Sequence, residues 1–464
     1  MRVPLAGRSA LGAAWAIADR LGVVARTPGE LVQVLTAGIR RVVLVLPDLD
    51  AAHEPERVAD LIEWLADLDG FHLVVGVGDG SPAHVRLCAR PDAAPASWPE
   101  RPPSPTPPPG ARRPSEGGGV AGGFDPDDPG AVCAADPWRV TARYGAGDAG
   151  GDHHGGLRPA WLRAGQSLCR EQAPSRRALV LLAALDDAAD PRLRPALERL
   201  AALEPWRVRW TRARGDVSPP WPGPVTALAI CAAPEPGRLL VAVRPGTVRA
   251  LHTADGSPAG TPAHPGGRPA TALACLPGGT LLLLDERGRL HVPRPDPLAD
   301  AVAATLAAHP GTALAAAGGT VVVGDRVGSL HAFGLTGVHQ AAAHSGRVTA
   351  VAAVASPGPR VYSGGADGTV RSWTPGAGPR PAPLAERPCP VVALHAADTP
   401  GGPALAVAWG DGLVELYGPD GRRAEFRPGP PVRAVALTAD GADGEDCALV
   451  VGMDEALLCL APRR

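Results

Sequence analysis

A repeat of about 40 residues in the second half of the chain constrains its fold more than any other feature. In each copy a turn residue precedes a short apolar strand, and these turn residues are Gly246, Gly288, Gly328, Gly368, Gly412 and Glu455. Their spacings are 42, 40, 40, 44 and 43 residues. Two more apolar runs precede each turn, and a weaker fourth strand is expected in the variable stretch before the next copy. A fixed period of this length, built from short strands, predicts the blades of a β-propeller.

The repeat predicts an all-β propeller over residues 205–464, with six blades, and with seven as the alternative count. The last copy ends after its third strand, which leaves its blade one strand short. The segment PWRVRWTRARG, residues 205–215, precedes the first full copy and alternates like a strand. We therefore predict that residues 205–215 supply the missing strand and close the ring.

One copy, HSGRVTAVAAVASPGPRVYSGGADGTVRSW at residues 344–373, resembles the WD-repeat β-propeller family. His344, Ser363, Asp367 and Trp373 stand where this family carries four hydrogen-bonded side chains. The resemblance implies that this structural tetrad stiffens one blade and is not catalytic.

The other copies depart from the tetrad pattern. Their residues at the tryptophan position are Leu251, Pro293, Phe333, Tyr417 and Leu460. Their residues at the aspartate position are Pro245, Arg287, Val327, Asp411 and Asp454. Because one copy alone keeps all four residues, we expect the other blades to be held mostly by apolar packing.

The chain before the repeats divides into three segments, so the protein is expected to be multidomain. Residues 1–92 predict an α/β fold, since the apolar runs RRVVLVLP and FHLVVGVG flank an amphipathic helical stretch. This order forms a βαβ unit, whose strands are expected to be parallel. Residues 93–134 are rich in proline and glycine, which predicts a disordered linker. Residues 135–204 hold three short helical segments, which predicts a small helical connector.

The stretch RRVVLVLPDLDAA, residues 40–52, resembles the strand that carries the second acidic motif, Walker B, in signal-transducing (STAND-type) P-loop ATPases. Many proteins of that family carry C-terminal repeats. The resemblance covers residues 1–200 and implies a degenerate, truncated remnant of the ATPase fold. Pro47 takes the place of the first acid and Ala51 that of the following one, while Asp50 is kept.

The sequence contains no phosphate-binding P-loop. The nearest string, Gly7-Arg8-Ser9, has arginine in place of the lysine and leaves no room for a preceding strand. The 45 basic residues of the chain are all arginine, so no lysine could replace it. Asp48 and Asp50 could still hold Mg²⁺, which leaves weak binding of ATP and magnesium open. The other interpretation is an acidic loop that caps the following helix.

Charge and cysteine content narrow the function classes. The 45 basic and 47 acidic residues give a net charge of -2, which does not favour nucleic acid or an anionic membrane as partner. The 8 cysteines lack C-x-x-C spacing, which predicts reduced thiols in a cytoplasmic protein and no metal site.

Two functions fit these observations. The first is a non-catalytic interaction scaffold or sensor, in which a propeller face binds a protein or peptide partner and no cofactor is needed. The second is a nucleotide-dependent switch, either with weak ATP binding at Asp48 and Asp50 or with an ATP site completed by another chain. The missing P-loop favours the first, so we do not expect an enzyme. Residual ATPase activity belongs to the second hypothesis alone.

Overall fold

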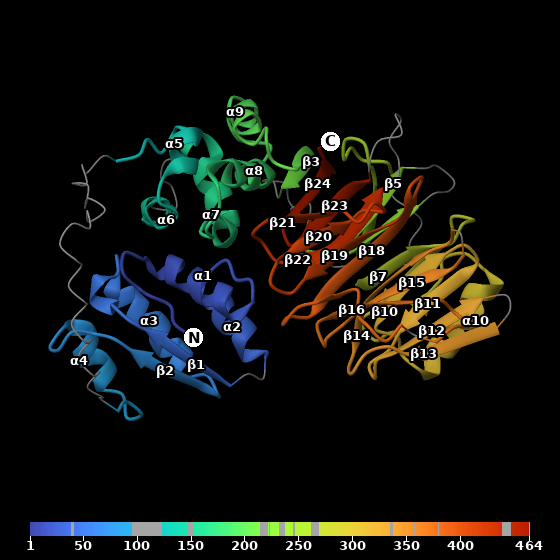
Figure 1. Cartoon of the computed structure of the whole chain (residues 1–464), viewed down its shortest axis with the longest axis horizontal. Coiled ribbons are helices and arrows are strands. Elements are labelled where there is room, and N and C mark those ends of the chain that lie inside the picture. The colour runs from blue at the N-terminus through green and yellow to red at the C-terminus, as the bar shows by residue number, and fades with distance from the viewer. Residues whose placement is uncertain are drawn as a thin grey trace, which may run out of the picture.

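The structure is a computed structural model of the chain. It describes residues 1–38, 41–94, 123–146, 153–213, 221, 223–231, 237–244, 246–260, 269–334, 337–356, 358–378, 380–438 and 447–463. Figure 1 shows an α/β unit at the N-terminus, a group of helices, and a six-bladed β-propeller.

The N-terminal unit places helices on one face of a small parallel sheet. Its elements are α1 (Ala10–Leu21), α2 (Pro28–Thr36), β1 (Val42–Leu46), α3 (Pro55–Ala66), β2 (Phe71–Val75) and α4 (Pro82–Cys88). β1 and β2 pair in parallel along their whole length. Alternate side chains, such as the buried Leu44, face α1 and α3. Val43 and Val74 point to the opposite face and are exposed.

Residues 1–5 form an extended segment beside β1. The pairing is parallel, and the Val3 amide donates to the Val45 carbonyl at 2.9 Å. The segment then leads through the turn at residues 7–9 into α1. Within residues 1–9 this pairing is an isolated bridge at Arg2 and not a strand, although the backbone hydrogen bonds continue to Leu5.

The helices of the connector begin earlier than the sequence predicted. They are α5 (Pro129–Ala134), α6 (Pro137–Gly145), α7 (Leu157–Leu168), α8 (Pro174–Ala184) and α9 (Leu193–Leu200). α5 lies inside segment 93–134, so the prediction of disorder is wrong at that end of the segment. The Asp128 carboxylate caps α5 by accepting from the Gly130 and Ala131 amides at 3.0 and 3.2 Å. Residues 95–122 of the predicted linker lie outside the described residues.

The N-terminal unit docks on the connector through α1 and α7. Trp15 is buried and lies over Gly165, where an added Cβ would come within 1.9 Å of the indole ring. Close packing therefore requires glycine at this position. Gln166 accepts from the Ala25 amide at 3.0 Å and donates to the Val23 carbonyl at 2.8 Å. These bonds satisfy backbone groups of the loop that follows α1.

The propeller consists of six antiparallel sheets, numbered here as blades 1 to 6 along the chain. Blade 1 holds β4 (Val225–Cys231), β5 (Arg238–Val243) and β6 (Thr247–His252), and blade 2 holds β7 (Ala270–Cys275), β8 (Leu281–Asp285) and β9 (Leu290–His291). Blade 3 holds β10 (Ala313–Ala317), β11 (Thr320–Gly324), β12 (Ser329–Gly334) and β13 (Gly337–Ala342). Blade 4 holds β14 (Val348–Val354), β15 (Arg360–Gly365), β16 (Thr369–Trp373) and β17 (Ala385–Glu386).

Blades 5 and 6 bring the chain back to its starting point in the ring. Blade 5 holds β18 (Val391–Thr399), β19 (Gly402–Trp409), β20 (Val414–Tyr417) and β21 (Arg423–Phe426). Blade 6 holds β22 (Val432–Thr438), β23 (Ala448–Met453) and β24 (Ala456–Pro462). The first strands of neighbouring blades contact one another in a closed cycle, from β4 round to β22 and back to β4. These six strands therefore surround the axis of the ring.

A strand from before the repeats completes blade 6. β3 (Trp206–Ala213) pairs antiparallel with β24, with Trp206 opposite Pro462 and Ala213 opposite Ala456. The prediction that the segment at 205–215 closes the ring is confirmed by these residues. Without β3, the backbone groups of β24 would form an open sheet edge.

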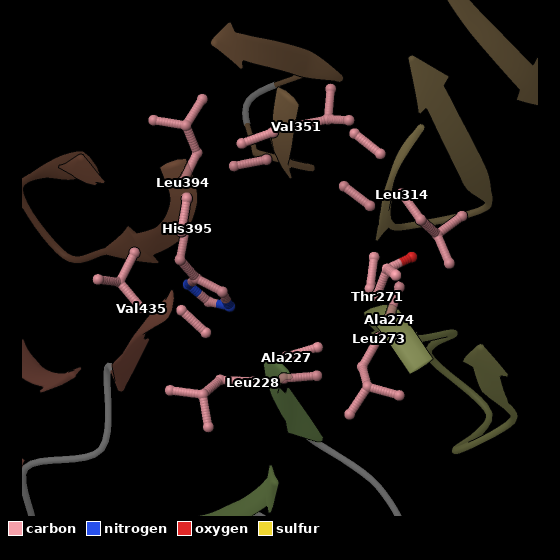
Figure 2. Close-up of a pocket in the computed structure, with 18 of the residues that line it drawn as sticks. Ala227, Leu228, Thr271, Leu273, Ala274, Leu314, Val351, Leu394, His395 and Val435 are labelled. Atoms are coloured by element: carbon pink, nitrogen blue, oxygen red, sulfur yellow. The ribbon is translucent and has the colours of Figure 1, made fainter. Parts of the chain in front are cut away.

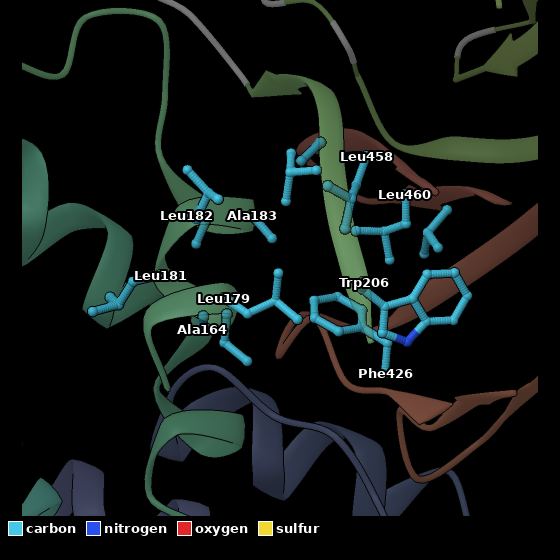
Figure 3. Close-up of a cluster of buried hydrophobic side chains, with 14 of the residues drawn as sticks. Ala164, Leu179, Leu181, Leu182, Ala183, Trp206, Phe426, Leu458 and Leu460 are labelled. Atoms are coloured by element: carbon cyan, nitrogen blue, oxygen red, sulfur yellow. The ribbon is translucent and has the colours of Figure 1, made fainter. Parts of the chain in front are cut away.

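α8 joins the connector to the core of the propeller. Its residues 178–184, ALVLLAA, are buried on every side. Figure 3 shows Leu179 of α8 beside Trp206 and Phe426, with Leu460 of β24 in the same cluster. A helix that is apolar all round needs cover on all sides. Connector helices cover one side of α8 and the propeller covers the other, so the connector is fixed to the ring.

Blade 2 departs from the all-β expectation. After β9 the chain forms α10 (Pro297–Ala308), which packs on β9 and β11. The Asp296 carboxylate accepts from the Leu298 and Ala299 amides, both at 3.0 Å. An aspartate cap followed by proline is a helix-start signature, and the sequence reasoning missed it. The prediction of a fourth strand in this stretch is therefore wrong.

A disulfide ties blade 1 to blade 2. Cys231 ends β4, Cys275 ends the neighbouring β7, and their Cα atoms lie 5.7 Å apart. The prediction that the cysteines are all reduced thiols is wrong for this pair. Their separation of 44 residues is close to one repeat, which puts both sulfurs at matching places in adjacent blades.

Replacing Trp206 tests the junction of β3, blade 5 and α8. The Trp206 side chain is buried, and its indole nitrogen donates to the Glu425 carbonyl at 3.0 Å. We expect Trp206→Ala to lower the free energy of unfolding, measured with urea, by about 3–5 kcal/mol. Trp64, which is 49% exposed on α3, supplies the control. Trp64→Ala should cost less than about 1 kcal/mol, and equal losses in both variants would contradict the assignment.

Candidate functional site

The six inner strands enclose a cavity of about 230 Å³ on the axis of the ring (Figure 2). Its lining comes from β4, β7, β10, β14, β18 and β22. Alanine is the commonest lining residue, accompanied by leucine, valine and threonine. Among the described lining residues, His395 and Arg433 carry the ionisable side chains, since Cys275 is held in the disulfide.

His395 occupies a place where the other blades have alanine. The matching residues are Ala229, Ala274, Ala315, Ala352 and Ala436. The imidazole ring of His395 reaches into the cavity (Figure 2). Its Nδ1 accepts from the Leu437 amide of β22 at 3.1 Å, so Nε2 carries the proton. Burial lowers the pKa of His395 to about 4, which keeps the ring neutral near pH 7.

The cavity opens at a mouth where the inner strands begin, since the lining residues Thr271 and Arg433 at that end are exposed. Four blades carry threonine there, namely Thr226, Thr271, Thr312 and Thr349. Their hydroxyls donate to backbone carbonyls, as from Thr349 to Gly364 at 3.0 Å. In blade 6 the place belongs to Arg433, whose Nε lies 2.8 Å from Asp454 Oδ1. The polar groups at the mouth therefore already have acceptors.

The structure brings three of the four tetrad side chains together in blade 4. His344 Nδ1 lies 3.1 Å from Asp367 Oδ1, and His344 Nε2 lies 2.9 Å from Ser363 Oγ. Because the ionised carboxylate can only accept, Nδ1 donates to Asp367, and the Ser363 hydroxyl donates to Nε2. Trp373 does not join them, since its indole nitrogen donates to the Ala377 carbonyl at 2.8 Å. The three joined side chains brace the blade and do not line the cavity.

Blades 2 and 3 contain polar pairs that the sequence reasoning missed. Asp285 Oδ2 lies 2.8 Å from His291 Nε2, and Asp325 Oδ2 lies 3.1 Å from His331 Nε2. The other oxygen of each carboxylate accepts from two amides of the turn that follows. The expectation that apolar packing mostly holds these blades is therefore incomplete. The missed signal is an aspartate and a histidine six residues apart in two consecutive repeats.

Blade 5 buries a carboxylate with three partners. Glu415 accepts from the Trp409 indole at 2.7 Å and from the Tyr417 hydroxyl at 2.8 Å, and it pairs with Arg423. A buried charge needs such partners to offset its desolvation. Glu415 thus fastens the strands of its own blade.

The two aspartates of the predicted nucleotide site lie on the loop after β1, at the C-terminal edge of the parallel sheet. Asp50 Oδ2 accepts from the Gly78 amide in the loop after β2, and this bond lowers the pKa of Asp50. Asp48 is exposed, with φ at 65°, directly before the short 3₁₀ helix Leu49–Ala51. Asp50 therefore ties two loops together, while Asp48 faces solvent.

Two amides at the start of α1, where a P-loop would hold phosphate, are already occupied. The Ala10 amide donates to Glu54 Oε2 at 3.1 Å, and the Gly12 amide donates to Ser9 Oγ at 3.2 Å. A helix N-terminus attracts negative charge, and here the Glu54 carboxylate supplies it from within the chain.

The described part of the chain contains no group of three His, Cys, Asp or Glu side chains that could hold a metal ion. None of the helices in the described ranges combines the length and apolar character needed to cross a membrane.

Comparison with known proteins identifies no family for this chain. No protein-family model and no curated protein matches the chain. One solved structure that matches is the crystal structure of the computationally designed Ika8 protein. The match has 18% sequence identity over 52% of this chain and 71% of that chain, with a TM-score of 0.31. A TM-score this low carries no argument about the fold or the function.

His395 is expected to make stability depend on pH. The usual pKa of a histidine is near 6.5, whereas burial lowers that of His395 to about 4. As the pH falls below about 6.5, the unfolded chain binds a proton at this residue that the folded chain does not bind. The free energy of unfolding should therefore fall by about 3 kcal/mol between pH 6.5 and 4 on account of His395.

Urea unfolding at several pH values measures this contribution. His395→Ala, which installs the residue of the other five blades, should remove this part of the pH dependence. The exposed His339 provides the control, and His339→Ala should leave the pH dependence unchanged. If His395→Ala and the unaltered protein lose stability in parallel below pH 6.5, the assignment is wrong.

Proposed function

We propose that this protein is a non-catalytic interaction scaffold whose propeller binds a protein or peptide partner on the face around the cavity mouth. The observation that carries the proposal is the uneven covering of this face. Among the described residues, the hydrogen bonds and ion pairs of the N-terminal unit and the connector with the propeller go to blades 5 and 6, and none goes to the turns of blades 1 to 4.

The contacts with blades 5 and 6 involve turns on the mouth face. The Ser167 hydroxyl of α7 donates to the carbonyl of Arg427, in the loop between β21 and β22, at 2.9 Å. Arg26, in the loop after α1, pairs with Glu455 in the turn between β23 and β24 at 3.1 Å. Gly412, in the turn between β19 and β20, also faces this loop. The described hydrogen bonds and ion pairs of this kind thus concentrate on one sector of the face.

The chemistry of the cavity supports binding over catalysis. A general base or activated nucleophile needs an available carboxylate, imidazole or thiol beside the reacting group. The described cavity lining contains no carboxylate, the threonine hydroxyls donate to carbonyls, and Arg433 pairs with Asp454. His395 keeps one N–H group, which can donate a hydrogen bond to a bound carbonyl or carboxylate.

A peptide-display selection against the full chain tests the proposal. We expect selected peptides to compete for one site that includes Val327, which is 77% exposed in the turn between β11 and β12 on the mouth face. Burial of a valine side chain is worth about 1.5 kcal/mol, so Val327→Asp should weaken binding about tenfold.

Val338 provides a matched control, because it is 60% exposed but lies on β13 at the outer rim of blade 3. Val338→Asp should leave peptide affinity unchanged, as measured by fluorescence anisotropy. Failure to select any peptide, or equal weakening by both variants, would count against binding at this face.

A nucleotide-dependent switch is the second candidate. It is favoured by the place of Asp48 and Asp50 at the C-terminal edge of parallel strands, where α/β folds bind ligands. The bond from Gly78 to Asp50 and the capping of α1 by Glu54 count against it. Calorimetric titration with ATP and Mg²⁺ should detect no binding at about 1 mM ATP, which is the upper end of typical KM values. A tight, magnesium-dependent signal abolished by Asp50→Ala would reverse the preference.

A further inference from the structure

We infer that the partner of the mouth face is an acidic peptide segment, bound by arginines of blades 1 to 4. This inference rests on the proposed function and adds the chemical class of the partner. The arginines are Arg244, Arg287, Arg289, Arg326 and Arg347, and together they are called the basic crescent.

Strand direction places the whole basic crescent on one face. Arg244 follows β5, Arg287 and Arg289 lie in the turn after β8, and Arg326 lies in the turn after β11. Each of these strands ends opposite the start of its inner strand, which is the mouth end of the cavity. Arg347 directly precedes the inner strand β14 and so lies at the same end.

The basic crescent has no acidic partners within the described residues. All of its members are exposed, and none forms an ion pair with a described carboxylate. The nearby carboxylates of Asp285 and Asp325 are engaged by backbone amides and by His291 and His331. Two exposed acids lie on the same face, Glu286 in the turn after β8 and Glu386 on β17, against the five arginines. Positive charge therefore predominates on this sector.

Arginines in the covered sector of the same face are neutralised. Arg433 pairs with Asp454 at 2.8 Å, and both Arg387 and Arg427 pair with Asp411. The contrast is informative because the net charge of the chain is only -2. Uncompensated arginines coincide with the sector that the N-terminal unit and connector leave uncovered.

The opposite face of the propeller has charges of both signs. It carries Arg294, Arg360 and Arg422, together with the acids Asp398 and Asp420. Arg422 pairs with Asp420 at 3.1 Å. The basic crescent is therefore a property of the mouth face, and does not simply reflect the abundance of arginine in the chain.

The side chains of this face suit carboxylates of a peptide. Guanidinium groups bind carboxylates through two parallel hydrogen bonds, and the arginines are spread over neighbouring blades as an extended segment would require. The exposed Val327, beside Arg326, offers an apolar contact within the basic crescent. Binding of single-stranded nucleic acid also requires aromatic rings for base stacking. Of the aromatic side chains in the described chain, the strongly exposed one is Trp64, which lies on α3 and away from this face.

Fluorescence anisotropy with the full chain tests the inference. The probe is a labelled 12-residue peptide rich in glutamate with one central leucine, and its glutamine analogue is the neutral reference. Arg287→Gln, Arg326→Gln and Arg347→Gln are combined in one variant. Arg294→Gln, Arg360→Gln and Arg422→Gln are combined in a control variant, which removes the same charge from the opposite face.

We expect the acidic peptide to bind more tightly than the glutamine analogue, and to lose affinity as salt is raised. Each exposed arginine–carboxylate pair changes Kd by about 1.5- to 5-fold. The Kd of the crescent variant for the acidic peptide should therefore be at least about tenfold higher. The control variant should stay within about twofold of the unaltered protein. Equal weakening in both variants would overturn the inference, because it would indicate a general charge effect.

Two further probes test whether a phosphopeptide or a nucleic acid binds this face in place of an acidic peptide. Binding of a phosphoserine version of the peptide without binding of the glutamate version would overturn the assignment to carboxylates. Tighter binding of a single-stranded oligonucleotide of equal charge would overturn the assignment to a peptide. If display selection yields neutral peptides that bind the crescent variant normally, the acidic partner is wrong while the scaffold function stands. If no peptide of any charge binds, the scaffold function itself fails.

Discussion

The pairing of β3 with β24 is the contact on which the rest of the structure depends. It supplies the fourth strand of blade 6 and removes an open sheet edge. The same strand carries Trp206, against which α8 packs, so ring closure and the docking of the connector share one element. The connector in turn holds α1 through Gln166 and the close packing of Trp15 on Gly165. The three parts of the chain are thus positioned by a series of contacts that starts at β3.

Most of the propeller could be predicted from the sequence, because each blade repeats one turn and the spacing of turns survives changes in the side chains. The closing strand followed from a missing strand in the last repeat. The helices α5 and α10 were not predicted, although Asp128 and Asp296 are visible cap residues, because both helices lie in stretches without the repeat pattern. The partner of Trp373 could not be predicted either, since it depends on the path of the chain after β16.

The candidate site was harder to predict than the fold. A single histidine in an apolar strand carries no motif, and His395 becomes informative when six inner strands are aligned by their common register. The pairs Asp285–His291 and Asp325–His331 were hidden because the family pattern directed attention to Arg287 and Val327. The loop contact of Asp50 depends on Gly78, which is close in space because β1 and β2 are parallel neighbours. Each of these residues acquires its role from a contact across strands, and short sequence motifs do not record such contacts.

The propeller has a covalent link between blades 1 and 2, the disulfide between Cys231 and Cys275, and a noncovalent closure in blade 6. A covalent bond joins blades 1 and 2. Because it closes a loop of 44 residues, it lowers the conformational entropy of the unfolded chain and so raises the free energy of unfolding by about 4 kcal/mol. Noncovalent contacts join β3 to β24 at the other end of the chain path, namely the backbone pairing and the packing of their side chains. Under heat or mechanical load, the ring should therefore part at blade 6 first. Blades 1 and 2 would stay linked by the disulfide, and the propeller could refold from this pair.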